Sequence, residues 1–446
     1  MLVPVSTVAT SVADICRAAR RAARELAQID TARKDAALTA IAQALIARTD
    51  RILAANARDM QSGRESGLSD ALLDRLALDE ARIAGIARAV GQIVALPDPV
   101  GEVIEGRRLP NGLDMRKVRV PLGVVAVVYE ARPNVTIDAT ALCLKSGNAI
   151  VLRGSSTAAH SNAVLAQIAS EAAVGAGLPE GCVSLVAGGG REELAELAKQ
   201  TETVDLIIPR GGEGLKATLS EVATVPVIYA ASGNCHVYVD AGADLEQAQA
   251  IVMNAKTQRP GVCNAAETLL VHEAVADAFI PLIVESLMQA GVSVHADART
   301  HGLVAAAPAG TSAANGRSGV AGPSGCPPAL GVASEQDWAT EYLAMTLAVG
   351  VVDSVTDAIE HISRYGSGHS EAIVTRDTGA ARAFQLGVDA ACVYVNASTR
   401  FTDGGEFGMG AEIGNSTQKL HARGPIGLRE LCTFKYLVTG AGHVRG

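Results

Sequence analysis

The segment around Cys263 has the residue types that make a thiol nucleophilic. In NAKTQRPGVCNAAETLL (Asn254–Leu270), Lys256 and Arg259 precede the cysteine, and a nearby glycine permits close backbone approach. Cations lower the pKa of a thiol and favour the thiolate, which is the reactive form. Lys256 and Arg259 could instead bind an anionic substrate. Most single cysteines are buried apolar residues, so this segment alone leaves a structural role open.

Asn134 is the second residue that could take part in covalent chemistry. It lies in ARPNVT (Ala131–Thr136), directly after the apolar run GVVAVVYE, and Pro133 stiffens the exit from that run. Ligands of open α/β sheets gather at the carboxyl ends of the strands, where Asn134 would lie. A side-chain amide paired with a backbone N–H forms an oxyanion hole. An asparagine that only completes a turn is the alternative.

Two segments rich in glycine or hydroxyl groups could bind a nucleotide, although no G-x-G-x-x-G string is present. VSLVAGGGREEL (Val183–Leu194) has the pattern of strand, glycines and helix, so amide N–H groups near Gly189 could face an anion. In IVLRGSSTA (Ile150–Ala158), Arg153 ends a strand and hydroxyls beginning at Ser155 open the next helix. A fixed cation beside hydroxyls suits a ribose or its 2′-phosphate. A structural glycine turn and a surface arginine beside a capping serine are the alternatives.

Helices and strands must alternate to position these residues. Residues 11–96 have apolar side chains at helical spacing, and an exposed hairpin is expected at 109–120, around an Asn-Gly pair. Short apolar runs separated by helix-length segments then predict parallel sheets covered by helices. The expected strands are GVVAVVYE, NAIVLR, CVSLVAGG, VDLIIP and VPVIYA, then ETLLVH, EAIVTR and AACVYVN in a second stretch beginning near Asp244. Residues 305–331 lack such a pattern and are interpreted as a surface connection.

Composition excludes several classes of function. The 446 residues carry a formal net charge of -9 and are 48% hydrophobic, which is typical of a folded chain and argues against a nucleic-acid backbone as partner. The apolar runs fall short of the ~20 residues that a membrane-spanning helix needs, and the first residues lack the basic region of a secretory signal. The eight cysteines are scattered singly, away from histidines at metal-ligand spacing. We therefore expect a cytoplasmic protein with reduced thiols, no disulfide and no metal site, and with Cys143 and Cys392 in its core.

Longer segments carry a resemblance to a known family. They are VPLGVVAVVYEARPNVTIDA, LKSGNAIVLRGSSTA, NAKTQRPGVCNAAETLLVH, FTDGGEFGMGAEIGNSTQKLHARGPIGL and, most specifically, VDSVTDAIEHISRYGSGHSEAIVT (Val352–Thr375). Together they resemble the aldehyde dehydrogenase superfamily and, within it, the gamma-glutamyl phosphate reductase family, over almost the whole chain. The last segment matches the family signature at Ala358, His361, Ile362, Tyr365, Gly366, Ser367, His369, Ser370, Glu371 and Ile373. The residue pattern alone would leave His361 and His369 as ordinary helix or loop histidines.

The resemblance implies roles for individual residues. It implies that Cys263 is the nucleophile, that Asn134 supplies the oxyanion-hole amide, and that Arg153 stands where relatives often carry a lysine contacting the adenosine ribose. An arginine there favours NADPH, because a guanidinium binds a 2′-phosphate bidentately. Glu341, in TEYLAM, matches the acid that contacts the nicotinamide ribose in relatives, and a surface role is its alternative. Arg400 is a candidate for binding the α-carboxylate of the substrate.

One departure from hydrolytic aldehyde dehydrogenases bears on the acyl acceptor. Those enzymes carry a glutamate upstream of the nucleophile to activate water, whereas no Asp or Glu lies between Glu221 and Asp240 here. Exchange of a thioester with phosphate needs no deprotonated water. The resemblance therefore implies NADPH-dependent reduction of L-glutamyl 5-phosphate to L-glutamate 5-semialdehyde, with release of phosphate, in proline biosynthesis. A CoA-acylating aldehyde dehydrogenase and a scaffold that sequesters the acyl phosphate are the alternatives.

The resemblance also implies a fold and partners. We expect an α/β, aldehyde dehydrogenase-like fold with two Rossmann-like domains and a β-hairpin oligomerisation element. The expected NADP-binding domain covers 1–108 and 129–241, the catalytic domain covers 242–424, and the oligomerisation element covers 109–128 and 425–446. The last strand is expected at Leu431–Val438. An exposed two-stranded unit gains by pairing with another subunit, which favours a homodimer or homotetramer. Contact with glutamate 5-kinase is a further expectation, whereas neither nucleic acid nor membrane is expected as a partner.

Overall fold

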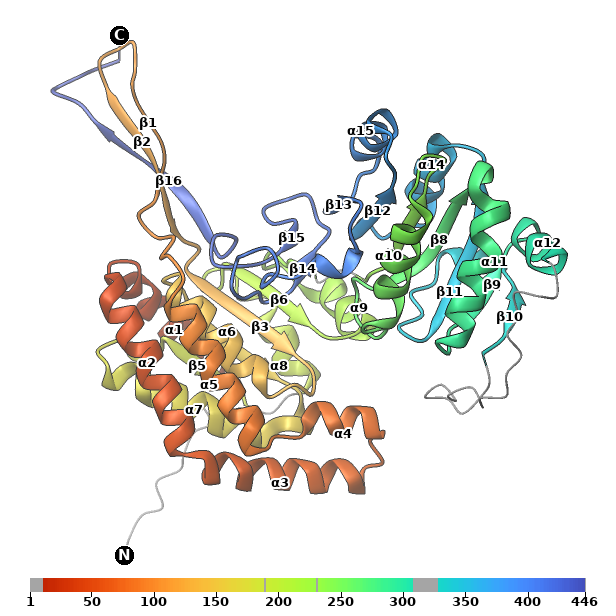
Figure 1. Cartoon of the computed structure of the whole chain (residues 1–446). Helices are drawn as coiled ribbons and strands as arrows, with labels where there is room; N and C mark the ends of the chain where they lie inside the picture. Colours follow the sequence, from red (N-terminus) through yellow and green to blue (C-terminus); the bar gives the residue numbers. More distant parts are fainter. Residues whose placement is uncertain (1–10, 188–189, 230–231, 308–327, 446) are drawn as a thin grey trace, which may run out of the picture. The chain divides into compact units, whose positions relative to one another are not determined.

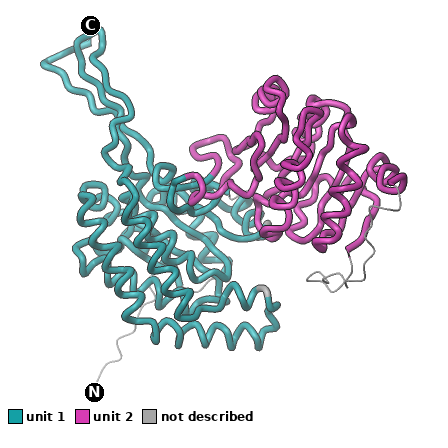
Figure 2. The backbone as a smooth tube through the Cα atoms, viewed as in Figure 1, with its two compact units in different colours: residues 1–230, 408–414, 425–446 teal, residues 231–407, 415–424 magenta. Residues whose placement is uncertain are grey.

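The computed structural model describes residues 11–187, 190–229, 232–307 and 328–445. The chain divides into two compact units (Figure 2). Unit 1 comprises residues 1–230, 408–414 and 425–446, and unit 2 comprises residues 231–407 and 415–424. Each unit has its own parallel sheet. The predicted α/β fold with two Rossmann-like parts is therefore confirmed.

A four-stranded parallel sheet forms the centre of unit 1. Its strands β3 (Val124–Tyr129), β4 (Ala149–Gly154), β5 (Val183–Leu185) and β6 (Leu206–Arg210) pair in the order β5-β4-β3-β6. Every residue of β3 and β4 is buried, as their continuous apolar runs predict for strands covered on both faces. The described part of the expected strand 225–230 makes a single bridge, between Ile207 and Val227. Pro226 lacks the N–H that a longer ladder would require.

Helices cover both faces of this sheet (Figure 1). They are α1 (Val12–Leu26), α2 (Thr31–Ala47), α3 (Thr49–Glu65), α4 (Asp70–Leu76), α5 (Glu80–Val94), α6 (Asn134–Lys145), α7 (Ala159–Gly175), α8 (Arg191–Leu197) and α9 (Glu213–Val222), with a 3-10 turn η1 at Ser156–Ala158. α2, α3 and α5 pack with α6 and α7 on one face, whereas α1 and α8 pack together on the other. Ser11, Asp30 and Asp79 each accept a backbone N–H at a helix start, and the helices predicted across 11–96 are confirmed.

Three antiparallel strands form a separate sheet that projects from the rest of unit 1 (Figure 1). They are β1 (Val103–Arg108), β2 (Asp114–Pro121) and β16 (Cys432–Thr439), in the order β1-β2-β16. The predicted Asn-Gly turn joins β1 to β2, and Gly112 has the positive φ, 90°, that such turns need. The hairpin begins before the range 109–120 that was expected for it, and the last residues of 109–128, the first part of the expected oligomerisation element, belong to β3 of the parallel sheet.

Unit 2 contains a seven-stranded parallel sheet. Its strands are β7 (Cys235–Val239), β8 (Ala266–His272), β9 (Ser293–Ala296), β10 (Leu330–Val332), β11 (Thr346–Val352), β12 (Ser370–Val374) and β13 (Cys392–Val395), in the order β10-β9-β11-β8-β7-β12-β13. Val237 and Val239 pack into one hydrophobic core and Tyr238 into the other, because successive strand residues point to opposite faces. β7 pairs with β8 and β12, so residues 231–241, expected in the NADP-binding domain, lie in unit 2.

The helices of unit 2 connect these strands in the usual α/β alternation. They are α10 (Leu245–Thr257), α11 (Glu273–Gln289), α12 (Ala298–Ala306), α13 (Glu335–Trp338), α14 (Val355–Tyr365) and α15 (Thr378–Gly387), followed by a 3-10 turn η2 at Thr399–Phe401. The two-residue strands β14 (Asn415–Ser416) and β15 (Gly424–Pro425) pair with each other. Most of the expected surface connection 305–331 lies outside the described residues, and β10 begins near its end.

Cysteines, metal-binding groups and membrane spans can be assessed for the described residues. Cys143 and Cys392 are buried, which confirms their predicted place in the core. The seven described cysteines are free thiols, and Cys326 lies outside the described residues. Across the described residues, no group of three or more His, Cys, Asp or Glu side chains could hold a metal ion. None of the helices in the described ranges is long and apolar enough to cross a membrane.

Candidate active site

Cys263 lies at the amino-terminal edge of the unit 2 sheet. It precedes β8 by three residues and is half-buried. Because the strands of this sheet are parallel, the segments leading into β7, β11 and β12 meet at the same edge. These segments contain Asn234, Glu341 and His369. Ligands of open α/β sheets usually gather at the carboxyl ends of the strands, so unit 2 presents its candidate nucleophile at the opposite edge.

Two arginines share the electrostatic surroundings of Cys263. Arg400, in η2, donates from Nε to Oε1 of Gln258 at 2.8 Å and from Nη1 to Oδ1 of Asn264. Burial lowers the pKa of Arg400, and the charge of Arg259 lowers it further, whereas Cys263 acts in the opposite direction. Arg400 thus interacts electrostatically both with the Cys263 thiol and with Arg259. Such charge can stabilise a thiolate or an anionic substrate.

Lys256, the third cation of the sequence motif, is completely buried. Its Nζ lies 2.6 Å from Oε2 of Glu267, and neither side chain has exposed surface. The other carboxylate oxygen of Glu267 accepts the N–H of Leu343 at 3.2 Å. Burial lowers the pKa of Lys256 and raises the pKa of Glu267 to about 7. The pair ties α10 to β8, and the predicted contact of Lys256 with substrate stays a prediction.

The acidic side chains at this edge are bound by the protein itself. Oε1 of Glu341 accepts the N–H of Gly233 at 2.6 Å, so this carboxylate reaches the segment before β7. Glu371, in β12, is fully buried, and its Oε2 accepts the N–H of His236 at 2.7 Å. Together with Glu267, these carboxylates act as hydrogen-bond acceptors for main chain or lysine. The contact of Glu341 with a nicotinamide ribose stays a prediction.

Of the two histidines of the signature segment, His361 is half-buried and His369 is buried. Burial lowers the pKa of His361 to about 3 and that of His369 to about 4. The His361 ring packs edge-on against Trp338 and lies 4.7 Å from the ring of Tyr365. Nδ1 of His369 lies 2.8 Å from the hydroxyl of Ser370. The signature therefore specifies the packing of α14 and β12 next to the site, which the residue pattern alone did not indicate.

Asn134 begins α6 at the carboxyl edge of the unit 1 sheet. Its Nδ2 donates to Oδ2 of Asp138 at 2.9 Å, one helical turn further on. Burial raises the pKa of Asp138 to about 6, although the amide of Asn134 and the charge of Arg210 oppose the shift. The bond fixes the direction of the Asn134 amide, whose second N–H can point elsewhere. Asp138 was not among the predicted site residues, although its i, i+4 spacing from Asn134 was a usable signal.

Arg153 and Ser155 lie at the same edge of unit 1, at the end of β4. Nη2 of Arg153 donates to the carbonyl of Gly190 at 2.7 Å, and 8% of the residue is exposed. Burial lowers the pKa of Arg153, whereas the charge of Glu193 raises it. The Ser155 hydroxyl lies 2.5 Å from that of a nearby threonine. A cation and two hydroxyls at this edge fit a ribose phosphate, as a nicotinamide dinucleotide would present. Gly189 lies outside the described residues.

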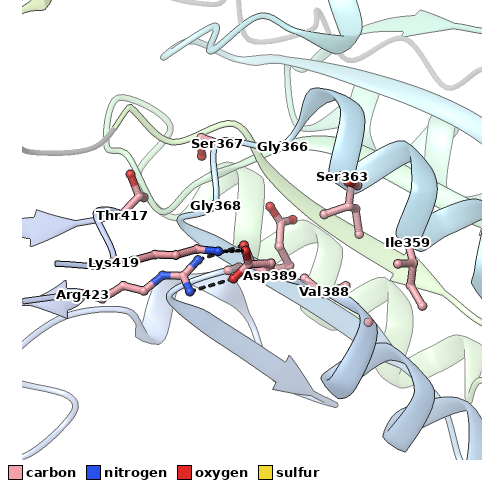
Figure 3. A pocket seen from close by; sticks show the side chains of 14 residues that line it. Ile359, Ser363, Gly366, Ser367, Gly368, Val388, Asp389, Thr417, Lys419 and Arg423 are labelled. Atoms are coloured by element: carbon pink, nitrogen blue, oxygen red, sulfur yellow. Dashed lines mark hydrogen bonds and ion pairs between the residues drawn. The ribbon is translucent and has the colours of Figure 1, made fainter.

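A cavity of about 320 Å³ lies beside the starts of β12 and β13 in unit 2 (Figure 3). Lys419 and Arg423 extend toward Asp389 within its lining, and both form ion pairs with that carboxylate. The buried carboxyl group of Glu371 also lines the cavity. The lining therefore mixes both signs of charge and does not select an anion.

Comparison with known proteins gives a consistent result. Residues 3–305 match the aldehyde dehydrogenase family. Over 427 residues the chain is 55% identical to a gamma-glutamyl phosphate reductase of Moorella thermoacetica, covering 96% of this chain and 97% of the relative. Over 441 residues it is 52% identical to a gamma-glutamyl phosphate reductase of Thermobifida fusca, covering 99% and 100%. A crystal structure of gamma-glutamyl phosphate reductase from Thermotoga maritima has a TM-score of 0.91 and 44% identity, covering 98% of this chain and 100% of the other.

Proposed function

We propose a specific route for the reduction of glutamyl phosphate, on the premise that this chain belongs to the aldehyde dehydrogenase family and to its gamma-glutamyl phosphate reductases. The chain is an oxidoreductase that acts on aldehyde groups, and its reaction belongs to proline biosynthesis. The proposed route uses NADPH as the reductant. It passes through a thioester at Cys263.

The covalent steps centre on Cys263. Its thiolate attacks the carbonyl carbon of L-glutamyl 5-phosphate, while the Asn134 amide and the backbone N–H of Cys263 donate to the oxyanion. The tetrahedral adduct collapses, the bond from carbon to the phosphate oxygen breaks, and inorganic phosphate leaves a thioester behind. When bound, the cofactor supplies a hydride to the thioester carbonyl. The resulting thiohemiacetal expels the Cys263 thiolate and releases L-glutamate 5-semialdehyde.

The observation that best supports this route is the charge around Cys263. Arg400 and Arg259 hold positive charge near the half-buried thiol. They can stabilise the thiolate, bind the acyl phosphate and receive the α-carboxylate of the substrate. The segment between Glu221 and Asp240 contains no Asp or Glu that could activate water. The absence of that base supports exchange of the thioester with phosphate over hydrolysis.

Four residues are proposed to hold the cofactor. Arg153 and Ser155 would take the adenosine ribose and its 2′-phosphate, with Gly189 near the pyrophosphate and Glu341 at the nicotinamide ribose. The buried guanidinium of Arg153 supports NADPH over NADH, because its planar fork matches a phosphate. The preference is one of affinity and does not require that NADH be excluded.

The three-stranded sheet of unit 1 is proposed as the oligomerisation element. It exposes large apolar side chains at Val103, Ile104, Phe434, Tyr436, Leu437 and Val438. Exposed apolar surface on a projecting sheet gains by pairing with another subunit, which supports a homodimer or homotetramer. Transient contact with glutamate 5-kinase would protect the labile acyl phosphate in transit. A cytoplasmic location is supported by the free thiols.

Trapping the thioester tests the proposed route. The protein is incubated with L-glutamyl 5-phosphate without NADPH, and its peptides are analysed by mass spectrometry. We expect a glutamyl adduct on Cys263 and none on Cys392, a buried thiol of the same sheet. Cys263→Ser should lose roughly 10³-fold or more in kcat, because no base activates the hydroxyl. Substantial turnover by this variant, or an adduct elsewhere, would rule out the route.

A further inference from the structure

The main chain of Cys263 lies where any residue other than glycine at position 233 would place its Cβ atom. A Cβ on Gly233 would lie 1.5 Å from the carbonyl oxygen of Cys263 and 2.6 Å from its Cα. Both separations are far below van der Waals contact, so any side chain at 233 would displace the backbone of the candidate nucleophile. No sequence pattern around Gly233 indicates this role.

The thiol of Cys235 contacts the same carbonyl group. Its Sγ donates to the carbonyl oxygen of Cys263 at 3.2 Å, and Cys235 has no exposed surface. The pairing of β7 with β8 slips by one residue at this point, since Cys235 opposes Ala266 and His236 opposes Thr268. Such bulges re-aim the backbone next to active sites. The Cys235 thiol thus binds the segment that leads into β8, at the position where the pairing of β7 with β8 becomes irregular.

The segment that makes these contacts is itself held on all sides within unit 2. The N–H of Gly233 donates to Glu341 at 2.6 Å. The side-chain amide of Asn234 donates to the carbonyls of Trp338 and Tyr365, at 2.6 and 2.8 Å. His236 is bound through its N–H to the buried carboxylate of Glu371, described above. Residues 233–236 are therefore hydrogen-bonded to the segments before β11 and β12. The same residues contact the main chain of Cys263 and so restrict its position.

We propose that residues 233–236 form a cradle that fixes the main chain of Cys263, and that Cys235 is a positioning residue for the reaction. The proposal rests on the nucleophilic role of Cys263 in the proposed function. Attack on an acyl carbon requires the sulfur to be placed within fractions of an ångström, and misplacement by about 1 Å can reduce the rate 10²-fold. The cradle would supply that placement through its contacts with the main chain of Cys263.

Replacing Cys235 tests the proposal with a conservative rescue. Cys235→Ala removes the S–H donor, and Cys235→Ser restores a donor of similar size. We expect Cys235→Ala to lower kcat by roughly three- to tenfold, the effect of losing one hydrogen bond, with KM changed less than twofold. Cys235→Ser should recover most of the loss. Cys392→Ala, which removes another buried thiol from the same sheet, is the control and should keep the normal kcat.

A second readout separates positioning from general damage. The rate at which iodoacetamide alkylates Cys263 is followed by peptide mass spectrometry across the pH range, in the absence of substrate. We expect a slower plateau rate or a shifted pH midpoint in Cys235→Ala, a near-normal profile in Cys235→Ser, and equal thermal midpoints for both. An unchanged kcat in Cys235→Ala, or a Cys235→Ser variant no better than alanine, would overturn the proposal.

Gly233→Ala gives a larger and independent effect. We expect kcat to fall by about 10²-fold or more, since the Cys263 backbone must move. Gly302→Ala is the matched control, because a Cβ at that helical glycine meets no atom within 4 Å. Activity of Gly233→Ala within twofold of the parent would contradict the cradle. Retained activity in Cys263→Ser would instead defeat the proposed function, so the two failures are distinguishable.

Discussion

Nζ of Lys256 lies 2.6 Å from Oε2 of Glu267, and both side chains are completely buried in unit 2. The pair joins α10 to β8, the strand that Cys263 precedes, and Glu267 also accepts the N–H of Leu343 near Glu341. A buried ion pair that links three segments of the site specifies their relative placement. Because Lys256 is bound to Glu267, the cation that interacts electrostatically with Cys263 is Arg400, which also interacts with Arg259.

Breaking this pair should destabilise unit 2. Lys256→Met leaves the Glu267 carboxylate buried with a single hydrogen-bond donor, and we expect a loss of about 3–5 kcal/mol in the free energy of unfolding, measured in urea. Replacing both residues, as Lys256→Met with Glu267→Leu, should recover most of the loss. Lys419→Met removes an exposed ion pair with Asp389 and should leave the midpoint unchanged. Equal midpoints for Lys256→Met and Lys419→Met would contradict the structural role of the buried pair.

Stability should depend on pH through Asp138. Its pKa is raised from 3.8 to about 6, so its protonated form stabilises the fold below pH 3.8, and this contribution is lost as the pH rises toward 6. Asp138→Asn removes the titration. Relative to the parent, we expect this variant to gain on the order of 1–3 kcal/mol in unfolding free energy between pH 4 and pH 7.5. Glu180→Gln, at an exposed carboxyl of the same unit, should show no such gain. A constant difference across that range would contradict the shift.

Arg153 should set the preference for the phosphorylated cofactor. Arg153→Ala is expected to raise KM for NADPH by roughly ten- to a hundredfold while changing KM for NADH little, because only NADPH has a 2′-phosphate. Arg153→Lys should fall between, since an ammonium keeps the charge but loses the bidentate fork. Steady-state kinetics with each cofactor measure this. Equal losses with both cofactors would mean that Arg153 acts only through its bond to Gly190.

Asn134 should matter in the transition state more than in substrate binding. Asn134→Ala is expected to lower kcat by roughly 10²–10³-fold with little change in KM, as removal of an oxyanion donor does. Asn134→Asp should be equally impaired above the pKa of the new carboxyl group, since it presents negative charge to the oxyanion. A normal kcat in Asn134→Ala would mean that Asn134 only begins α6 and binds Asp138.

The sequence predicts the sheet strands best where burial is complete. β3, β4 and β6 contain unbroken apolar runs and were identified, whereas β7 and β11, which are buried along most of their length, were not among the expected strands. β9 and β10 are short, with four and three residues, and such runs carry too little periodicity to be recognised. The apolar run 225–230 was expected to be a strand, but its described part makes a single bridge, because Pro226 lacks the N–H that a longer ladder requires.

The sequence singles out candidate site residues where chemistry needs a special side chain, as with Cys263, Asn134 and Arg153, and their roles stay predictions. The site was less predictable where a common residue acts through its place in the fold. Nothing local in sequence indicates that Gly233 lies under Cys263, because the two meet only through the pairing of β7 with β8. Lys256 illustrates the reverse. Its spacing from Cys263 suggested a ligand, whereas its side chain turns to a buried carboxylate across the strand.

The most direct test of the account is oxidation of L-glutamate 5-semialdehyde, followed by the absorbance of the reduced cofactor. NADP and NAD are compared, each with phosphate, with CoA, or with neither. The account predicts turnover only when phosphate is supplied, and faster turnover with NADP. Turnover with CoA would assign the chain to acyl transfer to a thiol, and turnover with neither acceptor would contradict the claim that water is not activated at this site.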